Sequence, residues 1–218
     1  MKILVNALSA RMGGIVTYTS NLMRSFAARG IDAAFAVPPE FPAPPASIRV
    51  IRFRANRMRP LYRLLWEQTV WRRVIARENP DLLFSSANFG VMTTSVPQLL
   101  LVREGGLFDP YYITNISPGQ GVRATFTRAA RRKLILASMR AADAVMVPTV
   151  AMKDTLLAWS PDLADKIVSN LYGTRLDHFS ASTATRRWRS DGLLRLLYVS
   201  EYYPHKRPGM MAEVVARL

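Results

Sequence analysis

The chain has 218 residues, of which 50% are hydrophobic, and a formal charge of +15 at pH 7. This length and apolar content can bury the core of a sizeable globular domain, which excludes a disordered chain. The absence of cysteine excludes disulfides and thiolate zinc sites, and with only His178 and His205 a histidine-rich metal site is also excluded. No run approaches the roughly 18 apolar residues of a membrane span, and MKILVNAL is too short for a signal peptide, so we expect a cytoplasmic chain.

The positive charge is concentrated in two segments. Nine arginines accompany a single acid, Glu67, between Arg49 and Arg77, and six basic residues without any acid lie between Gly121 and Ala142. Such segments attract the phosphates of nucleic acids, nucleotides or anionic membranes. They also fit the solvated helix faces of an arginine-rich protein, because net charge governs association and not fold.

Apolar runs alternate with helical patterns along the chain. A buried strand is predicted from Ile3 to Leu8, and a helix ending at Gly30 follows it. The inward face of that helix is Ile15, Tyr18, Leu22 and Phe26. The next predicted elements are strands at 33–37 and 48–53 and a helix at 60–77, with Leu61, Leu64, Leu65, Trp71, Val74 and Ile75 inward. Strands at 80–86 and 97–103, a helix at 122–142, a strand at 142–149, a helix at 150–159 and a strand at 166–172 complete the pattern. This alternation predicts an α/β fold, a parallel sheet with helices on both faces.

The composition changes after residue 179. Residues 180–192, SASTATRRWRSDG, are polar and without apolar period, which is typical of a linker. LLRLLYVS then predicts a buried strand, and PGMMAEVVARL predicts the start of a helix. One strand and one helix cannot bury a core, so we interpret 193–218 as the first unit of an incomplete second domain that follows a first domain at 1–179. Alternatively, this strand and helix extend the first sheet.

Gly13 and Gly14 lie between the first predicted strand and the following helix. In a parallel sheet, ligands bind outside the carboxyl ends of the strands. Glycines let a ligand approach the backbone closely, and the free amides that open a helix attract a phosphate. The pattern is neither G-x-G-x-x-G nor a Walker loop. The pair is therefore either part of a phosphate site or a purely structural tight turn.

Five segments in order resemble the retaining GT-B glycosyltransferases of family four, which use nucleotide-sugar donors. They are MKILVNALSARMGGIVTYTSNLMRSFAARG, PDLLFSSANFGVMTTSVPQLLLVRE, ADAVMVPTVAMKDTLL, KIVSNLYGTRLDHF and LLYVSEYYPHKRPG. The resemblance implies a first Rossmann-like domain and the beginning of a second. It also implies a strand, a helix and a strand within the second of these segments.

On the donor side, the resemblance implies that the glycine pair lies against the donor phosphates and that Lys206 neutralises the donor diphosphate. Glu201 stands where the family has an arginine, and a carboxylate there would repel a diphosphate. Another base would then have to replace that arginine. The candidates are His205 and Arg207.

On the acceptor side, Arg103 and Glu104 occupy a loop in which many family members have a histidine. Glu104 is the candidate catalytic residue and the candidate contact to sugar hydroxyls or to the acceptor. A solvated loop carboxylate is the alternative interpretation of Glu104.

The implied function is transfer of a sugar from a nucleotide-sugar donor to a glycan or lipid-linked acceptor in surface polysaccharide assembly, without a metal or cofactor. Fixed amides and Lys206 would stabilise the charge of the leaving diphosphate. Because the chain ends after one unit of the second domain, we expect these residues alone to be inactive. The basic segments suit an anionic membrane surface, so we expect peripheral association with the inner face of the membrane.

Two alternatives remain. A non-catalytic relative of the glycosyltransferases is suggested by Glu201 and by the missing histidine. A nucleic-acid-binding protein is supported by charge alone, and since no helix-turn-helix, zinc-finger or RNP-like motif is present, nucleic acid is not the expected partner.

Overall fold

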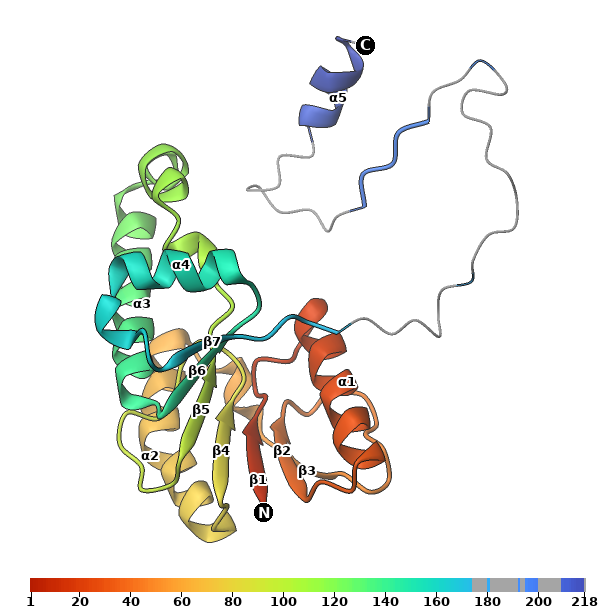
Figure 1. Cartoon of the computed structure of the whole chain (residues 1–218), viewed down its shortest axis with the longest axis vertical. Helices are drawn as coiled ribbons and strands as arrows, with labels where there is room; N and C mark the ends of the chain where they lie inside the picture. The colour runs from red at the N-terminus through yellow and green to blue at the C-terminus, as the bar shows by residue number, and fades with distance from the viewer. Residues whose placement is uncertain (174–179, 181–191, 193–194, 200–208, 218) are drawn as a thin grey trace. The chain divides into compact units, whose positions relative to one another are not determined.

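The computed structural model describes residues 1–173, 180, 192, 195–199 and 209–217, and it divides into two compact units, Met1–Tyr172 and Gly173–Leu218. The first unit is built on a seven-stranded sheet in the order β3-β2-β1-β4-β5-β6-β7 (Figure 1), with every pairing parallel. The predicted α/β parallel-sheet fold is confirmed. The strands are β1 (Ile3–Asn6), β2 (Ala33–Val37), β3 (Arg49–Arg52), β4 (Leu82–Ser85), β5 (Gln98–Leu101), β6 (Ala144–Val147) and β7 (Ile167–Ser169).

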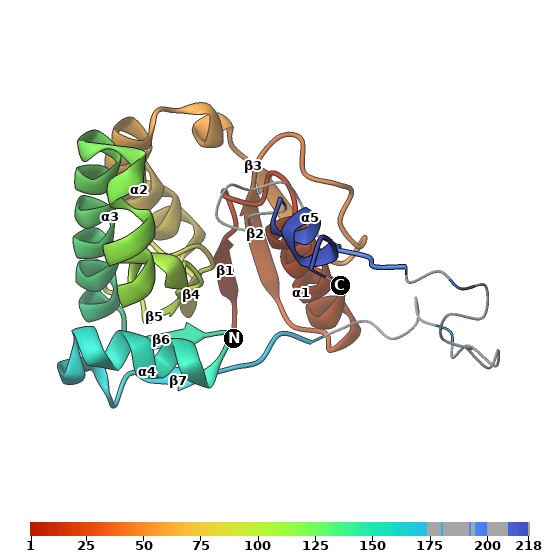
Figure 2. The same ribbon diagram turned by 90° about the horizontal axis from the view of Figure 1, so that it is seen from above.

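Helices cover both faces of the sheet, as Figure 2 shows from above. Helix α1 covers one face, and α2, α3 and α4 cover the other, because right-handed crossovers that run in opposite directions along a sheet place their helices on opposite faces. The α-helices are α1 (Gly14–Ala28), α2 (Pro60–Glu78), α3 (Val122–Ala141), α4 (Val150–Trp159) and α5 (Met210–Val215). The short helical turns are η1 (Arg54–Arg57), η2 (Gly105–Leu107), η3 (Tyr112–Ile116), η4 (Pro118–Gln120) and η5 (Pro161–Leu163).

The core lies in two layers, one on each side of the sheet. Alternate residues of β1 and β2, such as Val5 and Phe35, pack against the predicted apolar face of α1. The residues next to them along the strands point to the opposite face of the sheet. On that face, Leu4 packs with Trp71 of α2. Buried residues of β5 and β6 on that second side pack with α3 and α4. The strands are thus apolar on both faces, as expected for a fully covered parallel sheet.

The predicted inward face of α2 was wrong in its first turns. Trp71 and Ile75 are buried as expected, but Leu61 is 66% exposed and Leu65 is 53% exposed. The buried stripe instead includes Glu67. Since each helical residue is turned by about 100° from the previous one, Leu65 cannot share the face on which Leu64 is partly covered.

The helix expected between β4 and β5 is absent, since residues 86–97 form a loop without any helical segment. The buried side chain of Gln98 replaces the missing helical hydrogen bonds. Its Oε1 accepts from the Val91 amide at 2.8 Å, and its Nε2 donates to the Val91 carbonyl at 3.1 Å. A Cβ on Gly90 would lie 2.9 Å from Gln98 Oε1, so the loop can approach this amide only with a glycine there.

In the second unit, the predicted helix forms as α5, whereas residues 195–199 have no strand assignment. The interpretation of 193–218 as the first unit of a second domain stays a prediction, and so does the alternative in which this segment extends the first sheet. Within the described ranges, no helix is long and apolar enough to cross a membrane.

Candidate functional site at the carboxyl edge of the sheet

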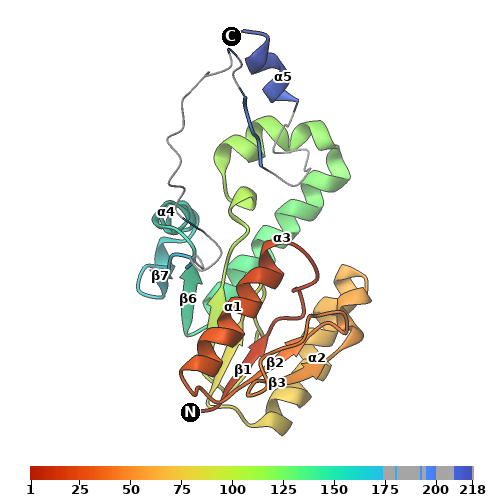
Figure 3. The same ribbon diagram turned by 90° about the vertical axis from the view of Figure 1, so that its right-hand side faces the viewer.

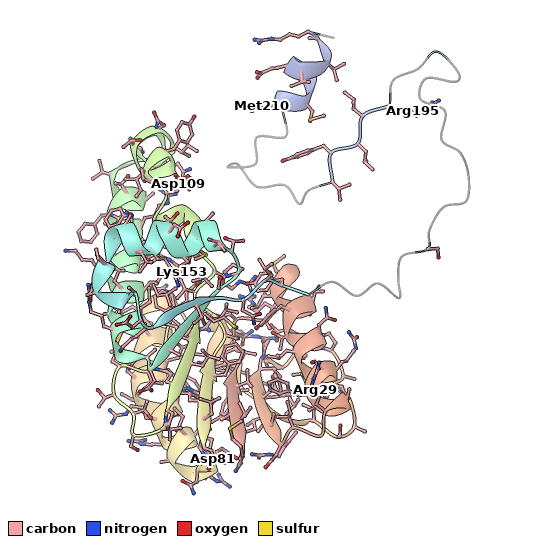
Figure 4. The ribbon with its side chains drawn as sticks, in the orientation of Figure 1. Arg29, Asp81, Asp109, Lys153, Arg195 and Met210 are labelled. Carbon is pink, nitrogen blue, oxygen red and sulfur yellow. The ribbon has the colours of Figure 1, made fainter. Side chains whose placement is uncertain are left out.

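All seven strands end at one edge of the sheet because they are parallel. Figure 4 labels Asp81, which lies at the amino edge, and Asp109, which lies on the segment beyond the carboxyl edge. The loops that follow β1, β4, β5 and β7 therefore come together at one edge. This is the edge at which ligands bind in open α/β folds.

The loop after β1 leads into the N-terminus of α1, where no side chain caps the first backbone amides. Gly13 is the N-cap of α1, with φ 67° and ψ −153°, a backbone conformation open essentially to glycine alone. No side chain caps α1, and its first turn contains no acid. A Cβ on Gly14 would meet nothing within 4 Å. The first amides of α1 are thus unobstructed, and the positive end of the helix dipole faces no carboxylate of its own turn.

Helix α2 supports this loop from the other face of the sheet. Arg63 donates from Nη2 to Ser9 Oγ at 2.8 Å and from Nε to Glu67 Oε1 at 3.0 Å. Burial raises the pKa of the Glu67 carboxyl, and the Arg63 guanidinium partly opposes that rise. Sequence spacing indicates the Arg63–Glu67 pair, four residues apart on a helix, but nothing in the sequence indicates Ser9 as the third member.

The loop after β5 is held by Asn88. Asn88 adopts the left-handed backbone conformation, with φ 66°. Its Oδ1 accepts from the amides of Arg103 at 2.8 Å and Glu104 at 3.2 Å, and its Nδ2 donates to Glu104 Oε2 at 3.3 Å. Sequence reasoning missed Asn88, although an asparagine in the turn-forming stretch ANFG is a signal for this conformation.

Glu104 is part of this network. Arg131 of α3 donates from Nη2 to Glu104 Oε2 at 2.5 Å, and its guanidinium lies 5.4 Å from the centre of the Phe89 ring. The side chain of Glu104 is 35% exposed. Oε2 is therefore committed to Asn88 and Arg131, whereas Oε1 has no donor among the described residues. Glu104 is thus held by the structure and partly exposed, and its role as a catalytic or acceptor-binding residue stays a prediction.

Two tyrosines near this edge of the sheet are influenced by the charge of Arg103. The rings of Tyr18, on α1, and Tyr172, after β7, have centroids 5.1 Å apart. Burial, and secondarily Tyr172, raise the pKa of Tyr18 to about 12, while the positive charge of Arg103 acts in the opposite direction. Burial likewise raises the pKa of Tyr172 against the same charge. Both phenols thus stay protonated at neutral pH and can donate hydrogen bonds.

The remaining predicted site residues, Lys206, His205, Arg207 and Glu201, lie in the range 200–208, outside the described residues. The structure accordingly brings together Gly13 and Gly14 at the start of α1, and Arg103 and Glu104 on the loop after β5, at one edge of the sheet. In the described part of the chain, no cluster of three or more histidine, aspartate or glutamate side chains could hold a metal ion.

The profile described as Glycosyltransferase Family 4 matches residues 12–168. The chain belongs to Glycosyltransferase Family 4. The matched range includes the glycine pair at its N-terminal end, the Asn88 loop, Arg103, Glu104 and Arg131. Of the site residues that the structure describes, all except Ser9 and Tyr172 therefore lie within the family match. No curated protein matches the sequence.

Solved structures of two proteins resemble the chain. One is a glycosyltransferase from Rickettsia africae ESF-5, 16% identical, with a TM-score of 0.48, a match that covers 84% of this chain and 46% of that one. The other is UGT2 of Phytolacca americana in its apo form, 11% identical, with a TM-score of 0.52, covering 80% of this chain and 52% of that one. At such identity the second likeness shows a shared fold alone. The chain spans about half the length of both structures.

Proposed function

We propose that this family-4 chain is the donor- and acceptor-binding half of an enzyme that moves a sugar from a nucleotide-sugar donor to a glycan or lipid-linked acceptor. The observation that carries the proposal is the uncapped start of α1, preceded by Gly13 at the carboxyl edge of the sheet. Its open amides offer hydrogen-bond donors and a positive dipole end to the donor phosphates.

In the proposed reaction, the bond between the sugar and the diphosphate breaks and negative charge builds on the leaving group. The amides of α1 are fixed before the reaction, so they can stabilise this charge without reorganisation. The absence of an acid in the first turn of α1 favours the same state. Lys206 is the sequence candidate for a charged partner of the diphosphate. No step of this scheme calls for a metal.

For the acceptor, the proposed contact is Glu104. Asn88 and Arg131 hold its Oε2, which leaves Oε1 to accept a hydrogen bond from a sugar hydroxyl. A carboxylate held in one orientation loses little conformational entropy on binding.

The donor part of the proposal is tested with Gly14→Val in the full-length protein. The added methyl groups occupy the open space beside the first amides of α1, so we expect affinity for a nucleoside diphosphate to fall about tenfold or more. Gly119→Val is the matched control, because a Cβ there also meets nothing within 4 Å. Equal affinity of both variants and the unmodified protein in calorimetric titrations would contradict the placement of the donor site.

Lys206→Ala tests the second donor contact. Loss of a charge-assisted hydrogen bond to the diphosphate is expected to cost about 1.5 to 3 kcal/mol of binding free energy. Glu201→Arg sharpens the test: it strengthens binding if Glu201 merely occupies the arginine position, and weakens binding if Glu201 holds a neighbouring base in place.

Turnover distinguishes an enzyme from a non-catalytic relative. We expect the full-length protein to transfer sugar, and residues 1–218 alone to transfer none, because this chain spans about half the length of the solved structures that it resembles. Donor binding by the full-length protein without any transfer would favour the non-catalytic relative. Turnover by the 218-residue chain alone would contradict the two-part organisation.

The acceptor side of the proposal includes a membrane-bound location, consistent with a role in surface polysaccharide assembly. The segment from η2 to the first turns of α3 extends beyond the sheet (Figures 1 and 3). It exposes Tyr111 at 63%, Val122 at 88% and Phe126 at 75%. Arg123 lies among them, lines a hollow of about 460 Å³, and makes no hydrogen bond or ion pair with any described residue. Apolar side chains interleaved with unpaired cations are suited to an anionic lipid surface.

Sedimentation with vesicles that contain phosphatidylserine tests this location. We expect Phe126→Asp to reduce sedimentation of the full-length protein strongly at low salt. We expect Arg123→Gln to weaken the free energy of vesicle binding by about 1 kcal/mol. Val150→Asp is the matched control, because Val150 is 59% exposed but lies on α4. Unchanged sedimentation of Phe126→Asp would leave these residues as ordinary solvated surface.

A further inference from the structure

The guanidinium of Arg103 is half-buried and has no counterion among the residues that the structure describes. Its Nη1 is buried without any hydrogen-bond partner, and the group makes no hydrogen bond or ion pair with any residue that the structure describes. The other half-buried arginines in the described residues all have acceptors or ring partners. They are Arg63, Arg128, Arg131 and Arg132.

The carboxylate next to Arg103 in the chain cannot neutralise it. Glu104 is already paired with Arg131 at 2.5 Å and bonded to Asn88. Asn88 also holds the Arg103 amide, so the position of Arg103 on the loop is fixed. A partly buried charge without a partner is costly to maintain, and proteins keep such groups mainly where a ligand supplies the opposite charge.

Two further hydrogen-bond donors, the phenols of Tyr18 on α1 and Tyr172 after β7, come from elements that reach the same edge of the sheet. The phenols of Tyr18 and Tyr172 contact each other, and neither hydroxyl has a hydrogen-bond partner among the described residues. The charge of Arg103 acts on both phenols. Three groups that can donate hydrogen bonds, one of them charged, thus lie at the carboxyl edge of the sheet without an acceptor among the described residues.

We propose that Arg103, together with the hydroxyls of Tyr18 and Tyr172, forms a binding subsite for an oxyanion, a phosphate or a carboxylate, of one of the substrates. The inference rests on the proposed function for the identity of these substrates. The oxyanion belongs either to the donor diphosphate, since Tyr18 lies one helical turn after Gly14, or to an acidic acceptor sugar. A planar guanidinium binds either group through two parallel hydrogen bonds.

Calorimetric titration of the full-length protein with two probes tests the subsite. Inorganic pyrophosphate represents the donor diphosphate, and glucuronate represents an acidic acceptor sugar. We expect Arg103→Met to weaken binding of at least one probe about tenfold, and the affected probe identifies the source of the oxyanion. Arg73→Met is the matched control, since it removes the same charge from an exposed position on α2 outside the proposed sites, and it is expected to change affinity less than about twofold. Equal effects of both variants on both probes would overturn the proposal.

Thermal unfolding supplies a second readout. An arginine that serves the fold loses stabilising contacts on replacement, whereas a half-buried charge kept for a ligand does not. We expect the Tm of Arg103→Met, without ligand, to equal or exceed that of the unmodified protein. A clear fall in Tm with unchanged affinity for both probes would assign Arg103 to the fold and reject the subsite.

Tyr172→Phe tests the subsite without touching the charge. We expect about threefold to tenfold weaker binding of the same probe, from the loss of one hydrogen bond. Unchanged affinity in both Tyr172→Phe and Tyr18→Phe would exclude the tyrosines from the subsite. If Gly14→Val loses nucleoside diphosphate binding while Arg103→Met retains every probe, the subsite is wrong and the proposed donor site still stands.

Discussion

The loop after β1 and the loop after β5 meet at the same edge of the sheet but are built in opposite ways. The β1 loop exposes backbone, with Gly13 in a conformation that excludes side chains and with α1 uncapped. The β5 loop is held by side chains. Asn88 accepts hydrogen bonds from the amides of Arg103 and Glu104, and Arg131 donates one to the Glu104 carboxylate. The β1 loop can bind a ligand through backbone amides because no side chain covers them. The β5 loop can bind a ligand through the Arg103 guanidinium and the Glu104 carboxylate, because Asn88 and Arg131 hold this loop in place.

This difference predicts how each loop fails. A backbone site is damaged by adding atoms, because any side chain strains Gly13 or obstructs the amides. A side-chain site is damaged by removing atoms, because each lost partner leaves a polar group unsatisfied. Substitutions that add atoms should therefore impair the β1 loop, and substitutions that remove atoms should impair the β5 loop.

The largest expected loss of stability is at Asn88. Asn88→Ala removes the acceptor of two amides and places alanine in a left-handed conformation, so we expect the free energy of unfolding to fall by about 2 to 4 kcal/mol. Asn88→Gly restores the backbone freedom but not the hydrogen bonds, and should recover about 1 kcal/mol of that loss. Urea unfolding measures both. A change below about 0.5 kcal/mol in Asn88→Ala would show that the β5 loop does not depend on this side chain.

The glycine pair should respond unequally. Gly13→Ala forces alanine into a region essentially restricted to glycine, so we expect the free energy of unfolding to fall by about 1 to 3 kcal/mol. Gly14→Ala should be neutral or stabilise by up to about 1 kcal/mol, since Gly14 is helical and its Cβ would meet open space. Denaturant unfolding of the two variants side by side checks the contrast. Equal losses at both positions would contradict the geometry of this loop.

Glu67, which pairs with the Arg63 side chain that supports the β1 loop, should make the stability of the protein depend on pH. Burial raises the pKa of Glu67 above its usual value of 4.5, so the native state binds this proton more tightly than the unfolded state. The free energy of unfolding should therefore fall as pH rises from about 4.5 through the raised pKa, by about 1.4 kcal/mol for each unit of the rise.

Glu67→Gln should remove this part of the pH dependence, measured as urea midpoints between pH 4 and pH 7. Glu78→Gln is an informative counterpart, because Arg49 holds the pKa of Glu78 below its usual value. The stability from Glu78 is present above the unfolded pKa and is lost on acidification, which is the opposite sign. An identical pH profile of Glu67→Gln and the unmodified protein would refute the effect.

The smallest effects should distinguish the site from the ordinary surface. Arg131→Gln breaks the pair with Glu104, whose side chain is 35% exposed, and should lower the free energy of unfolding by about 1 kcal/mol. The pair of Arg140 with Asp162 is more exposed, at 52% and 54%, so we expect Asp162→Asn to leave stability unchanged. The Arg140 guanidinium lowers the pKa of Asp162 chiefly through a hydrogen bond, yet water screens that interaction. A larger loss for Asp162→Asn than for Arg131→Gln would reverse this ranking.

Much of the candidate site could be located from the sequence, but its connections could not. Gly13, Gly14 and Glu104 were identifiable because each follows an apolar strand, where a parallel sheet binds its ligands. Their partners lie far away in the chain: Ser9 meets Arg63, and Glu104 meets Arg131. Such pairings depend on which strands become neighbours, and no local pattern encodes that order.

The sequence by itself determined the succession of strands and helices, because apolar periodicity reports which residues must avoid water. It located α1, α3 and α4 and the seven strands to within a few residues. Only the tertiary structure decided that Leu61 and Leu65 are exposed and that a loop joins β4 to β5. It also decided that Tyr18 and Tyr172 are in contact and that Arg103 Nη1 is buried without a partner among the described residues. The physical reason is that burial and pairing depend on contacts between residues distant in the chain, whereas periodicity describes only neighbours.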